Sequence, residues 1–471
     1  MTRLNGGRID FNMIKIILAL AWPTMLEQLL QTAVQYVDTA MVGSLGTQAT
    51  AAVGATSTVN WLVGSTVSAF GVGFLAFIAK ALGAGDKALA KRASGQVLSV
   101  TLCVGLLFTA ITLSLSGVIP ILMQVEEGTR SLASAYFFVL YIPMLPRCAS
   151  GIFSSVLRAA GDTKSPMKIA VLVNILNVVL NFFFIYPTRA LTLFGTEIIM
   201  PGCGFGVVGA AAASAVAYTV GGILITVVLF CHPEISPRGQ RIKPDKEILA
   251  PCMQVALPNM LQRFGTSFGY VAFASMINAL GDVATAAHTI ANTVESAFYI
   301  PGYGMQTAAA TLAGNAYGAK DKERLSSLCR MFIPIEIILM IISGAALFFL
   351  APPLVGIFTE SAEVSTLAVT VLRMVAVSEP FYGFSIIVEG FMQGVGRTRA
   401  PFMYNILGMW GIRIVGTFIA TVIFPLGLIS AWACMILHNL MLFVFFLVSF
   451  IRNSWNPLAS RDGIKAKSDS P

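Results

Sequence analysis

Charged residues are scarce in this chain of 471 residues: Asp, Glu, Lys and Arg together make up 11%, against 56% hydrophobic residues. Soluble globular domains carry about 25% charged residues, and a soluble protein with so few charges could not cover its surface. The hydrophobic runs exceed the roughly 18 residues that cross a bilayer as a helix, and they recur along the whole chain. The class of soluble proteins is therefore excluded, and the sequence predicts an all-α, multi-pass membrane protein that is embedded in the lipid bilayer.

Residues that ligate metals or act as nucleophiles are scarce as well. The chain has three histidines and seven cysteines, and it contains no C-x-x-C or H-E-x-x-H motif. The pattern Gly204-x-Gly206-x-x-Gly209 matches a dinucleotide fingerprint in spacing alone and follows no predicted strand, so we interpret its glycines as points of close helix packing. We predict that the chain is not an enzyme and has no cofactor, metal centre or disulfide framework.

The net charge of +8 does not indicate nucleic-acid binding. Lys and Arg lie in short segments between every second pair of hydrophobic runs, whereas the alternate loops contain only Arg130 and Arg189. This asymmetry is typical of the positive-inside rule. We therefore expect both termini on the cytoplasmic side of a plasma (inner) membrane, with a disordered cytoplasmic tail over residues 453–471.

Hydrophobic windows bounded by polar, glycine or proline residues predict twelve membrane spans. In chain order they cover residues 12–43, 51–79, 93–118, 131–159, 166–187, 206–231, 249–279, 286–315, 327–351, 364–394, 401–424 and 427–451. Several windows are longer than a straight span requires, which indicates tilted or bent helices.

An internal repeat relates the two halves of the chain at one constant separation, that between Pro23 and Pro258, here called the repeat offset. Four further matches share this register: residues 45–46 with 280–281, 49–52 with 284–287, 83–87 with 318–322, and 161–166 with 396–401. Six spans per half insert both halves in the same orientation, so the repeats are parallel and related by an axis along the membrane normal. We predict two pseudo-symmetric six-helix bundles, an N-terminal lobe over residues 1–235 and a C-terminal lobe over 248–452, with a cytoplasmic loop at about 232–247.

Several motifs together resemble the multidrug and toxic compound extrusion (MATE) family over nearly the whole chain. They are Pro23…Val37-Asp38-Thr39, Leu45-Gly46, Gly83-Ala84-Gly85-Asp86, Arg158-Ala159-Ala160-Gly161-Asp162-Thr163-Lys164-x-Pro166, Gly209-Ala210-Ala211-x-Ala213-Ser214, Val294-Glu295-Ser296…Pro301-Gly302-Tyr303-Gly304 and Gly318-Ala319. The resemblance implies a bacterial transporter whose N-terminal lobe is similar to the proton-coupled, DinF-like branch.

Asp38 lies well inside the first hydrophobic run, where an ionised carboxylate is costly. A buried carboxyl group can bind and release a proton near neutral pH. The alternative is a position close enough to the outer end of a long helix for the carboxylate to stay hydrated. The resemblance implies that Asp38 is the cation-coupling carboxylate of the N-terminal lobe.

Asn177 and Asn181 are four residues apart and share one face of the fifth predicted span, with Asn174 one turn earlier. These amides either hold helices together by hydrogen bonds or belong to the coupling site. The resemblance implies the second role, in one network with Asp38, and it implies an Asp where this chain has Asn181, which removes one titratable group. The resemblance adds two supporting residues, Tyr136 and Ser214.

The C-terminal half has no equivalent of Asp38, because the repeat offset leads to Phe273. Where sodium-linked relatives carry a Glu and an Asp, this chain has Thr266 and Tyr382. Other charges lie within predicted spans, as site or cavity residues or as ion pairs that neutralise each other. They are Glu295, Glu379, Glu389, Arg263 and Arg413.

We predict a monomeric, cation-coupled antiporter that exports small organic compounds, cationic or lipophilic drugs or metabolites, by alternating access, with a bend of the first span at Pro23. We favour a proton gradient as the driving force, although the oxygens of Asp38, Asn177 and Asn181 could coordinate sodium instead. One alternative is a flippase for lipids or lipid-linked oligosaccharides. Another, from a different class, is a membrane pore or interaction protein, which would need neither the repeat nor a carboxylate within a span.

Overall fold

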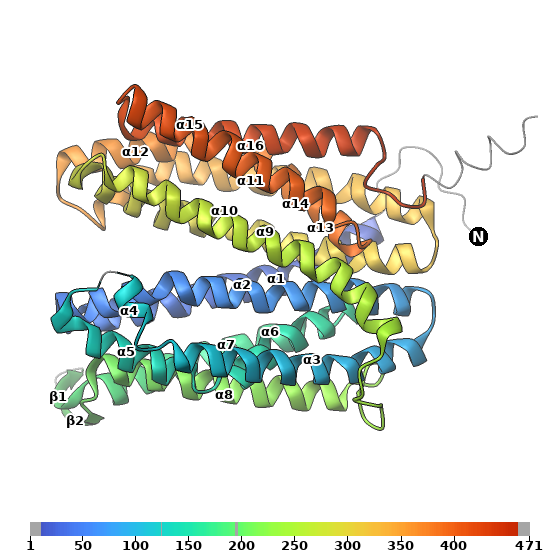
Figure 1. Ribbon diagram of the computed structural model, residues 1–471, viewed down its shortest axis with the longest axis horizontal. Coiled ribbons are helices and arrows are strands. Elements are labelled where there is room, and N and C mark those ends of the chain that lie inside the picture. Colours follow the sequence, from blue (N-terminus) through green and yellow to red (C-terminus); the bar gives the residue numbers. More distant parts are fainter. Residues whose placement is uncertain (1–10, 124, 194–195, 460–471) are drawn as a thin grey trace, which may run out of the picture. The chain divides into compact units, whose positions relative to one another are not determined.

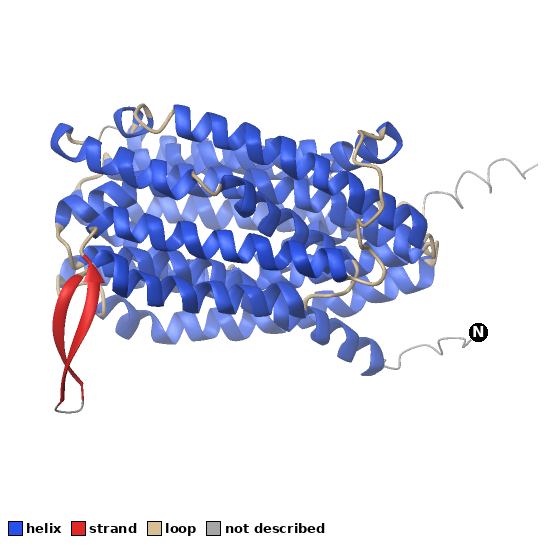
Figure 2. Ribbon diagram, turned by 90° about the horizontal axis from the view of Figure 1, so that it is seen from below, coloured by secondary structure: helices blue, strands red, loops and turns tan. Residues whose placement is uncertain are grey.

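The computed structural model describes residues 11–123, 125–193 and 196–459, which form long helices and one β-hairpin (Figures 1 and 2). The helices of the first half are α1 (Phe11–Gly43), α2 (Thr47–Gly83), α3 (Lys87–Ser114), α4 (Ile119–Leu122), α5 (Glu127–Tyr141), α6 (Met144–Ala159), α7 (Lys164–Ile185) and α8 (Gly206–Cys231). Residues 460–471, most of the predicted disordered tail, lie outside the described residues.

The second half follows the same plan. Its helices are α9 (Lys246–Asn278), α10 (Asp282–Gly318), α11 (Lys322–Gly356), α12 (Ala362–Ala376), α13 (Glu379–Gly394), α14 (Arg399–Ile406), α15 (Val415–Phe418) and α16 (Gly427–Ile451). Two π-helical segments, Leu407–Ile414 and Ile419–Ile423, flank α15. The antiparallel hairpin of β1 (Pro187–Leu193) and β2 (Thr196–Cys203) connects α7 to α8 and adds a short piece of β-structure to the helical fold.

The predicted repeat is confirmed by the local structure. The bounds of α9 and α10 are those of α1 and α2 moved by the repeat offset. Equivalent aspartates, Asp86 and Asp321, cap α3 and α11, and each accepts a hydrogen bond from a backbone N–H at 2.8 Å. Equivalent glycines, Gly46 and Gly281, precede α2 and α10 with φ values of 114° and 105°, which a residue with a Cβ rarely adopts.

Bent spans also occur at equivalent places. The axes of α5 and α6 differ by 53°, and those of α12 and α13 by 52°. Eight helices are long and apolar enough to cross a membrane, and the two bent pairs raise that number to ten among the described residues. The other two predicted spans, α9 and α10, have 33 and 37 residues and are sufficiently long, but their most apolar stretches are less hydrophobic. Together these elements form the twelve-helix, two-bundle architecture.

Contacts divide the chain into two compact units, and the boundary falls within helices. One unit, here called the N-unit, is Glu27–Ser267, and the other, the C-unit, is Met1–Leu26 with Phe268–Pro471. The division therefore cuts α1 and α9, whereas the predicted lobes, 1–235 and 248–452, were separated at the loop. As functional lobes, those ranges stay a prediction.

Helix contacts within each unit are close where glycine is present. In the N-unit, a Cβ added at Gly209 of α8 would lie 2.3 Å from the carbonyl oxygen of Phe184 in α7. This confirms the interpretation of Gly209 as a packing residue. In the C-unit, α10 and α11 pack against each other and against α13, and a Cβ at Gly394 of α13 would lie 2.1 Å from the carbonyl oxygen of Ala310 in α10.

Candidate functional site

Four side chains of the N-unit form a closed ring of hydrogen bonds around the carboxylate of Asp38. Asn181 Nδ2 donates to Asp38 Oδ1 at 2.6 Å, and Ser214 Oγ donates to Asp38 Oδ2 at 2.7 Å. Asn177 closes the ring, because its Nδ2 donates to Ser214 Oγ at 2.9 Å and its Oδ1 accepts from Asn181 Nδ2 at 3.2 Å. The ring joins α1, α7 and α8.

The ring is almost completely removed from solvent. Asp38 is 7% exposed and Ser214 1%, and both asparagines are fully buried. A buried carboxylate loses its hydration, and charge-assisted hydrogen bonds replace only part of it. No Lys or Arg forms an ion pair with Asp38 among the described residues. The charge of Asp38 is therefore held by two neutral donors alone.

Asp38 is the final acceptor of the hydrogen bonds in the ring. Ser214 Oγ accepts from Asn177 and donates to Asp38, so a proton added at Asp38 Oδ2 would oppose the Ser214 proton. The one ring oxygen without a partner among the described residues is Asn181 Oδ1. A protonated Asp38 can therefore donate to Asn181 only if that amide turns and gives up its own donation. A proton at Asp38 would therefore require a different set of hydrogen bonds between α1 and the helices α7 and α8.

Two of the predicted supporting residues, Tyr136 and Asn174, do not take part in the hydrogen-bond ring. Tyr136 of α5 is buried and within electrostatic range of Asp38, but it makes no hydrogen bond to the ring. Asn174 of α7 donates to the backbone oxygen of Ala170 at 2.8 Å, within its own helix. The structure therefore brings Asn177, Asn181 and Ser214 onto Asp38 and leaves Asn174 outside the ring.

Arg147 of α6 is surrounded by neutral groups of the N-unit. Its guanidinium donates to the side-chain oxygen of Asn60 and lies over the rings of Tyr141 and Tyr218, at 5.3 and 4.9 Å. Its Nη1 has no hydrogen-bond partner among the described residues. Cation–π contacts of this kind stabilise a cation by about 0.5–2 kcal/mol each, so they offset only part of its desolvation.

A buried ion pair of the N-unit was missed by the sequence analysis. Arg158, which the sequence indicated only as part of a family motif, donates to both carboxylate oxygens of Glu27 at 2.9 and 2.8 Å and to Ser155. The side chains of Arg158 and Glu27 are 9% and 2% exposed. Since the pair connects residues 131 positions apart on α1 and α6, no local pattern could have revealed it.

Pro23 lies inside α1, three residues before the boundary between the two units. It has no backbone N–H, so the carbonyl of Ala19 lacks its usual helical partner. The neighbouring Thr24 donates to the backbone oxygen of Ala21 at 2.7 Å and to that of Gly304 at 2.8 Å, both within the C-unit. The helix is thus anchored on one side of a position where its own hydrogen bonding is weakest.

The predicted charges of the second half are distributed over several environments. Glu295 and Glu379 are buried in the C-unit, at 6% and 2% exposure. Glu389 accepts hydrogen bonds from Gln393 at 3.0 Å and Asn405 at 3.4 Å. Arg263 belongs to the N-unit part of α9, where it donates to Asn259 at 3.2 Å.

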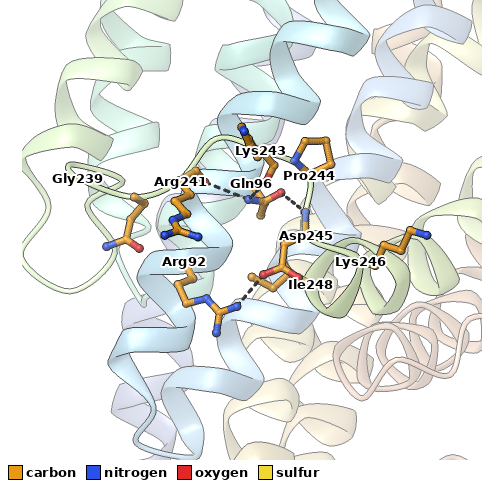
Figure 3. Close-up of a pocket in the computed structure, with 10 residues that line it drawn as sticks. Arg92, Gln96, Gly239, Arg241, Lys243, Pro244, Asp245, Lys246 and Ile248 are labelled. Atoms are coloured by element: carbon orange, nitrogen blue, oxygen red, sulfur yellow. Dashed lines mark hydrogen bonds and ion pairs between the residues drawn. The ribbon is translucent and has the colours of Figure 1, made fainter.

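An open pocket of about 580 Å³ lies away from the ring, where the segment after α8 crosses α3 (Figure 3). Gln96 of α3 donates to the backbone oxygens of Arg241 and Lys243 at 3.1 and 2.8 Å and accepts from the N–H of Asp245 at 2.9 Å. Arg92 pairs with Asp245 at 2.7 Å. These contacts fasten the loop to α3, and the pocket contains none of the predicted site residues.

Comparisons with known proteins agree with this architecture. The MatE family model matches residues 23–183 and 258–419, two segments that begin at the equivalent prolines Pro23 and Pro258. A Thermotoga maritima protein described as a probable multidrug resistance protein NorM is 27% identical over 453 residues, 96% of this chain and 95% of that protein.

Solved structures are similar over the same length. An outward-facing multidrug resistance MATE family transporter of the MOP superfamily has a TM-score of 0.86 with 26% identity, covering 95% of this chain and 97% of that one. A MATE structure in a bent conformation also has a TM-score of 0.86, with 25% identity and coverage of 96% and 97%.

The ring predicts unequal effects for two asparagines on the same helix. Asn177→Ala removes a partner from both Ser214 and Asn181, and a buried unsatisfied polar group costs about 1–3 kcal/mol. We expect Asn177→Ala to lower the free energy of unfolding by that amount. Asn174→Ala should change it by less than about 0.5 kcal/mol, because Asn174 does not belong to the ring. Denaturation in detergent, followed by tryptophan fluorescence, measures both. Equal losses would contradict the ring.

Proposed function

We propose that this chain, which belongs to the MatE family of membrane transporters, is a proton-coupled antiporter that exports small organic compounds. The chain is a multi-pass membrane transporter of a family that includes multidrug resistance proteins, and such transporters are driven by ion gradients and not by a cofactor. The proposal adds the proton and the residues that carry it. The relatives do not favour a flippase or a pore.

The observation that carries the proposal is the hydrogen-bond ring around Asp38. One carboxylate, buried within a ring of three neutral side chains, has two states that differ by one proton, and each state requires a different arrangement of Ser214 and Asn181. Sodium would require several oxygens to turn toward one point, but Asn177 Oδ1 and Ser214 Oγ already accept hydrogen bonds within the ring, so the ring would have to rearrange to hold the ion. The ring therefore favours a proton over sodium at Asp38.

Alternating access would follow from the position of Asp38 on α1. Protonation neutralises Asp38 and weakens its attraction to the donors on α7 and α8, so the N-unit part of α1 can move. Pro23, where the helix lacks one of its own hydrogen bonds, would absorb the bend, and the bond from Thr24 to Gly304 just after it would hold this point of α1 within the C-unit. Release of the proton on the other side of the membrane would restore the ring and complete the cycle.

The proposed substrates are small organic molecules, cationic or lipophilic, such as drugs and metabolites. Buried carboxyl groups at Glu295 and Glu379 would favour cations in a C-terminal cavity, with Glu389 and Arg263 as further charged residues of the transport path. Loops rich in Lys and Arg would place both termini in the cytoplasm, in a plasma (inner) membrane. We propose that the antiporter acts as a monomer.

Replacement of Asp38 by Asn tests the proposal. Asparagine keeps the size of the side chain but cannot bind and release a proton, so we expect dye efflux driven by a pH gradient to fall to the background rate. The rate is measured by the fluorescence of a dye that everted membrane vesicles take up when a pH gradient is imposed. Glu127→Gln, which neutralises an exposed carboxylate at the start of α5, should keep the wild-type rate. Undiminished transport by Asp38→Asn would remove Asp38 from the mechanism.

Replacement of Pro23 by Ala tests the hinge. Alanine restores a backbone N–H that donates a hydrogen bond to the carbonyl of Ala19, and this bond stiffens α1. We expect turnover in vesicles to slow several-fold while the concentration of dye for half-maximal binding changes less than about two-fold. Pro251→Ala, an exposed proline inside α9 with no equivalent in α1, is the matched control. Wild-type turnover by Pro23→Ala would show that the bend is not needed.

A further inference from the structure

Glu336 of α11 is a buried carboxyl group that the sequence analysis did not single out. It is 0% exposed, and neither of its carboxyl oxygens has a hydrogen-bond partner among the described residues. An ionised carboxylate without a donor or a cation is very costly in such a place, whereas a protonated carboxyl group is far less so. The surroundings of Glu336 therefore favour the protonated form of its carboxyl group.

The helices on both sides of Glu336 make room for its side chain. A Cβ added at Gly302 of α10 would lie 2.7 Å from Glu336 Oε1, and one added at Gly383 of α13 would lie 3.2 Å from Glu336 Cγ. A side chain at Gly302 would crowd the carboxyl group itself and one at Gly383 its stem, and at both places Met340 is closer still, at 2.2 and 2.6 Å. The space is thus matched to a glutamate on α11.

The other half of the repeat has different residues at the equivalent places. The repeat offset leads from Glu336 to Thr101, from Gly302 to Val67 and from Gly383 to Cys148. In the second half, the long side chain of Glu336 thus lies between two glycines. In the first half, the shorter side chain of Thr101 stands at the equivalent place, and Val67 and Cys148 replace the glycines. The two halves share their helices, but only the second builds a place for a carboxyl group here.

Glu336 has acidic neighbours and no close cation. Glu379 interacts electrostatically with both Glu336 and Glu295, and Arg413 with Glu295. Tyr299 interacts electrostatically with Glu295 and Glu379, and it belongs to a group of tyrosines with Tyr270, Tyr303 and Tyr382. No ion pair within 4.0 Å involves any of the three glutamates among the described residues. Like charges so close together cannot all be ionised without a strong penalty.

We propose that Glu336 is a second proton-carrying residue of this transporter, in the C-unit and separate from Asp38. A bound metal ion is not favoured, because the described residues contain no group of three His, Cys, Asp or Glu arranged to hold one. In the proposed step, the O–H bond of Glu336 breaks and its proton passes to water when the substrate cation enters beside Glu295 and Glu379. The negative charge that remains is balanced by that cation. Glu336 takes a proton from water again after the substrate has left.

The inference rests on the proposed antiport only for the identity of the substrate, and proton release on binding tests it without transport. Purified full-length protein is titrated with ethidium, a monovalent organic cation, in weakly buffered solution that contains a pH indicator. Because Asp38 is already ionised in the ring, we expect the wild type to release about one proton per bound ethidium and Glu336→Gln to release almost none. Glu323→Gln, which changes an exposed carboxylate on the same helix, should release as many as the wild type.

Asp38→Asn separates this inference from the proposed function. It should lose dye efflux driven by a pH gradient but still release protons on binding ethidium, through Glu336. Wild-type proton release by Glu336→Gln overturns the second site and leaves the proposed function intact, whereas wild-type efflux by Asp38→Asn overturns the proposed function and leaves Glu336 intact.

An infrared measurement keeps the inference testable if Glu336→Gln does not fold or does not bind ethidium. The wild-type difference spectrum on addition of ethidium should show loss of the carbonyl band of a protonated carboxyl group. That loss should be absent in Glu336→Thr, which carries the residue of the equivalent place in the first half, Thr101. A wild-type spectrum without such a loss, or a loss unchanged in Glu336→Thr, would contradict the assignment.

Discussion

The burial of one carboxylate among neutral donors is the constraint on which the rest of this molecule depends. Asp38 is removed from water and held by hydrogen bonds from Asn181 and Ser214. Such a charge is stable only while those donors stay in place, so the packing of α1 against α7 and α8 and the protonation of Asp38 are linked. Close contacts at Gly209 fix α8 against α7 and thereby hold the two sets of donors together.

The repeat shows how one scaffold carries two kinds of chemistry. Caps, turns and bends recur at the repeat offset, because both halves need the same helices. The residues at the two proposed proton sites do not recur: Asp38 corresponds to Phe273, and Thr101 to Glu336. In our account, the first half therefore binds its proton within a hydrogen-bond ring, and the second within a group of carboxyls that depends on space left by glycine.

Hydropathy, the repeat offset and the motifs were sufficient to predict the helical fold, the repeat and the side chains that meet at Asp38. Spacing alone could not separate Asn174 from Asn177 and Asn181, because Asn174 shares their stripe but lies about 10 Å along the helix from Asn181. Glu336 was missed for a different reason. It stands alone in a hydrophobic segment, and its meaning depends on Gly302 and Gly383, which become its neighbours only through packing. The Glu27–Arg158 pair likewise depends on tertiary contacts.

The driving ion is the most direct test of this account. Purified protein in sodium-free vesicles, with a pH gradient imposed and the membrane voltage clamped, should accumulate a cationic dye against its concentration gradient. A gradient of one pH unit supplies about 1.4 kcal/mol per proton, enough for about a ten-fold accumulation of a monovalent cation exchanged for one proton. Accumulation of the dye under these conditions is the result that the ring around Asp38 predicts. Accumulation that occurs only when a sodium gradient is imposed would contradict it.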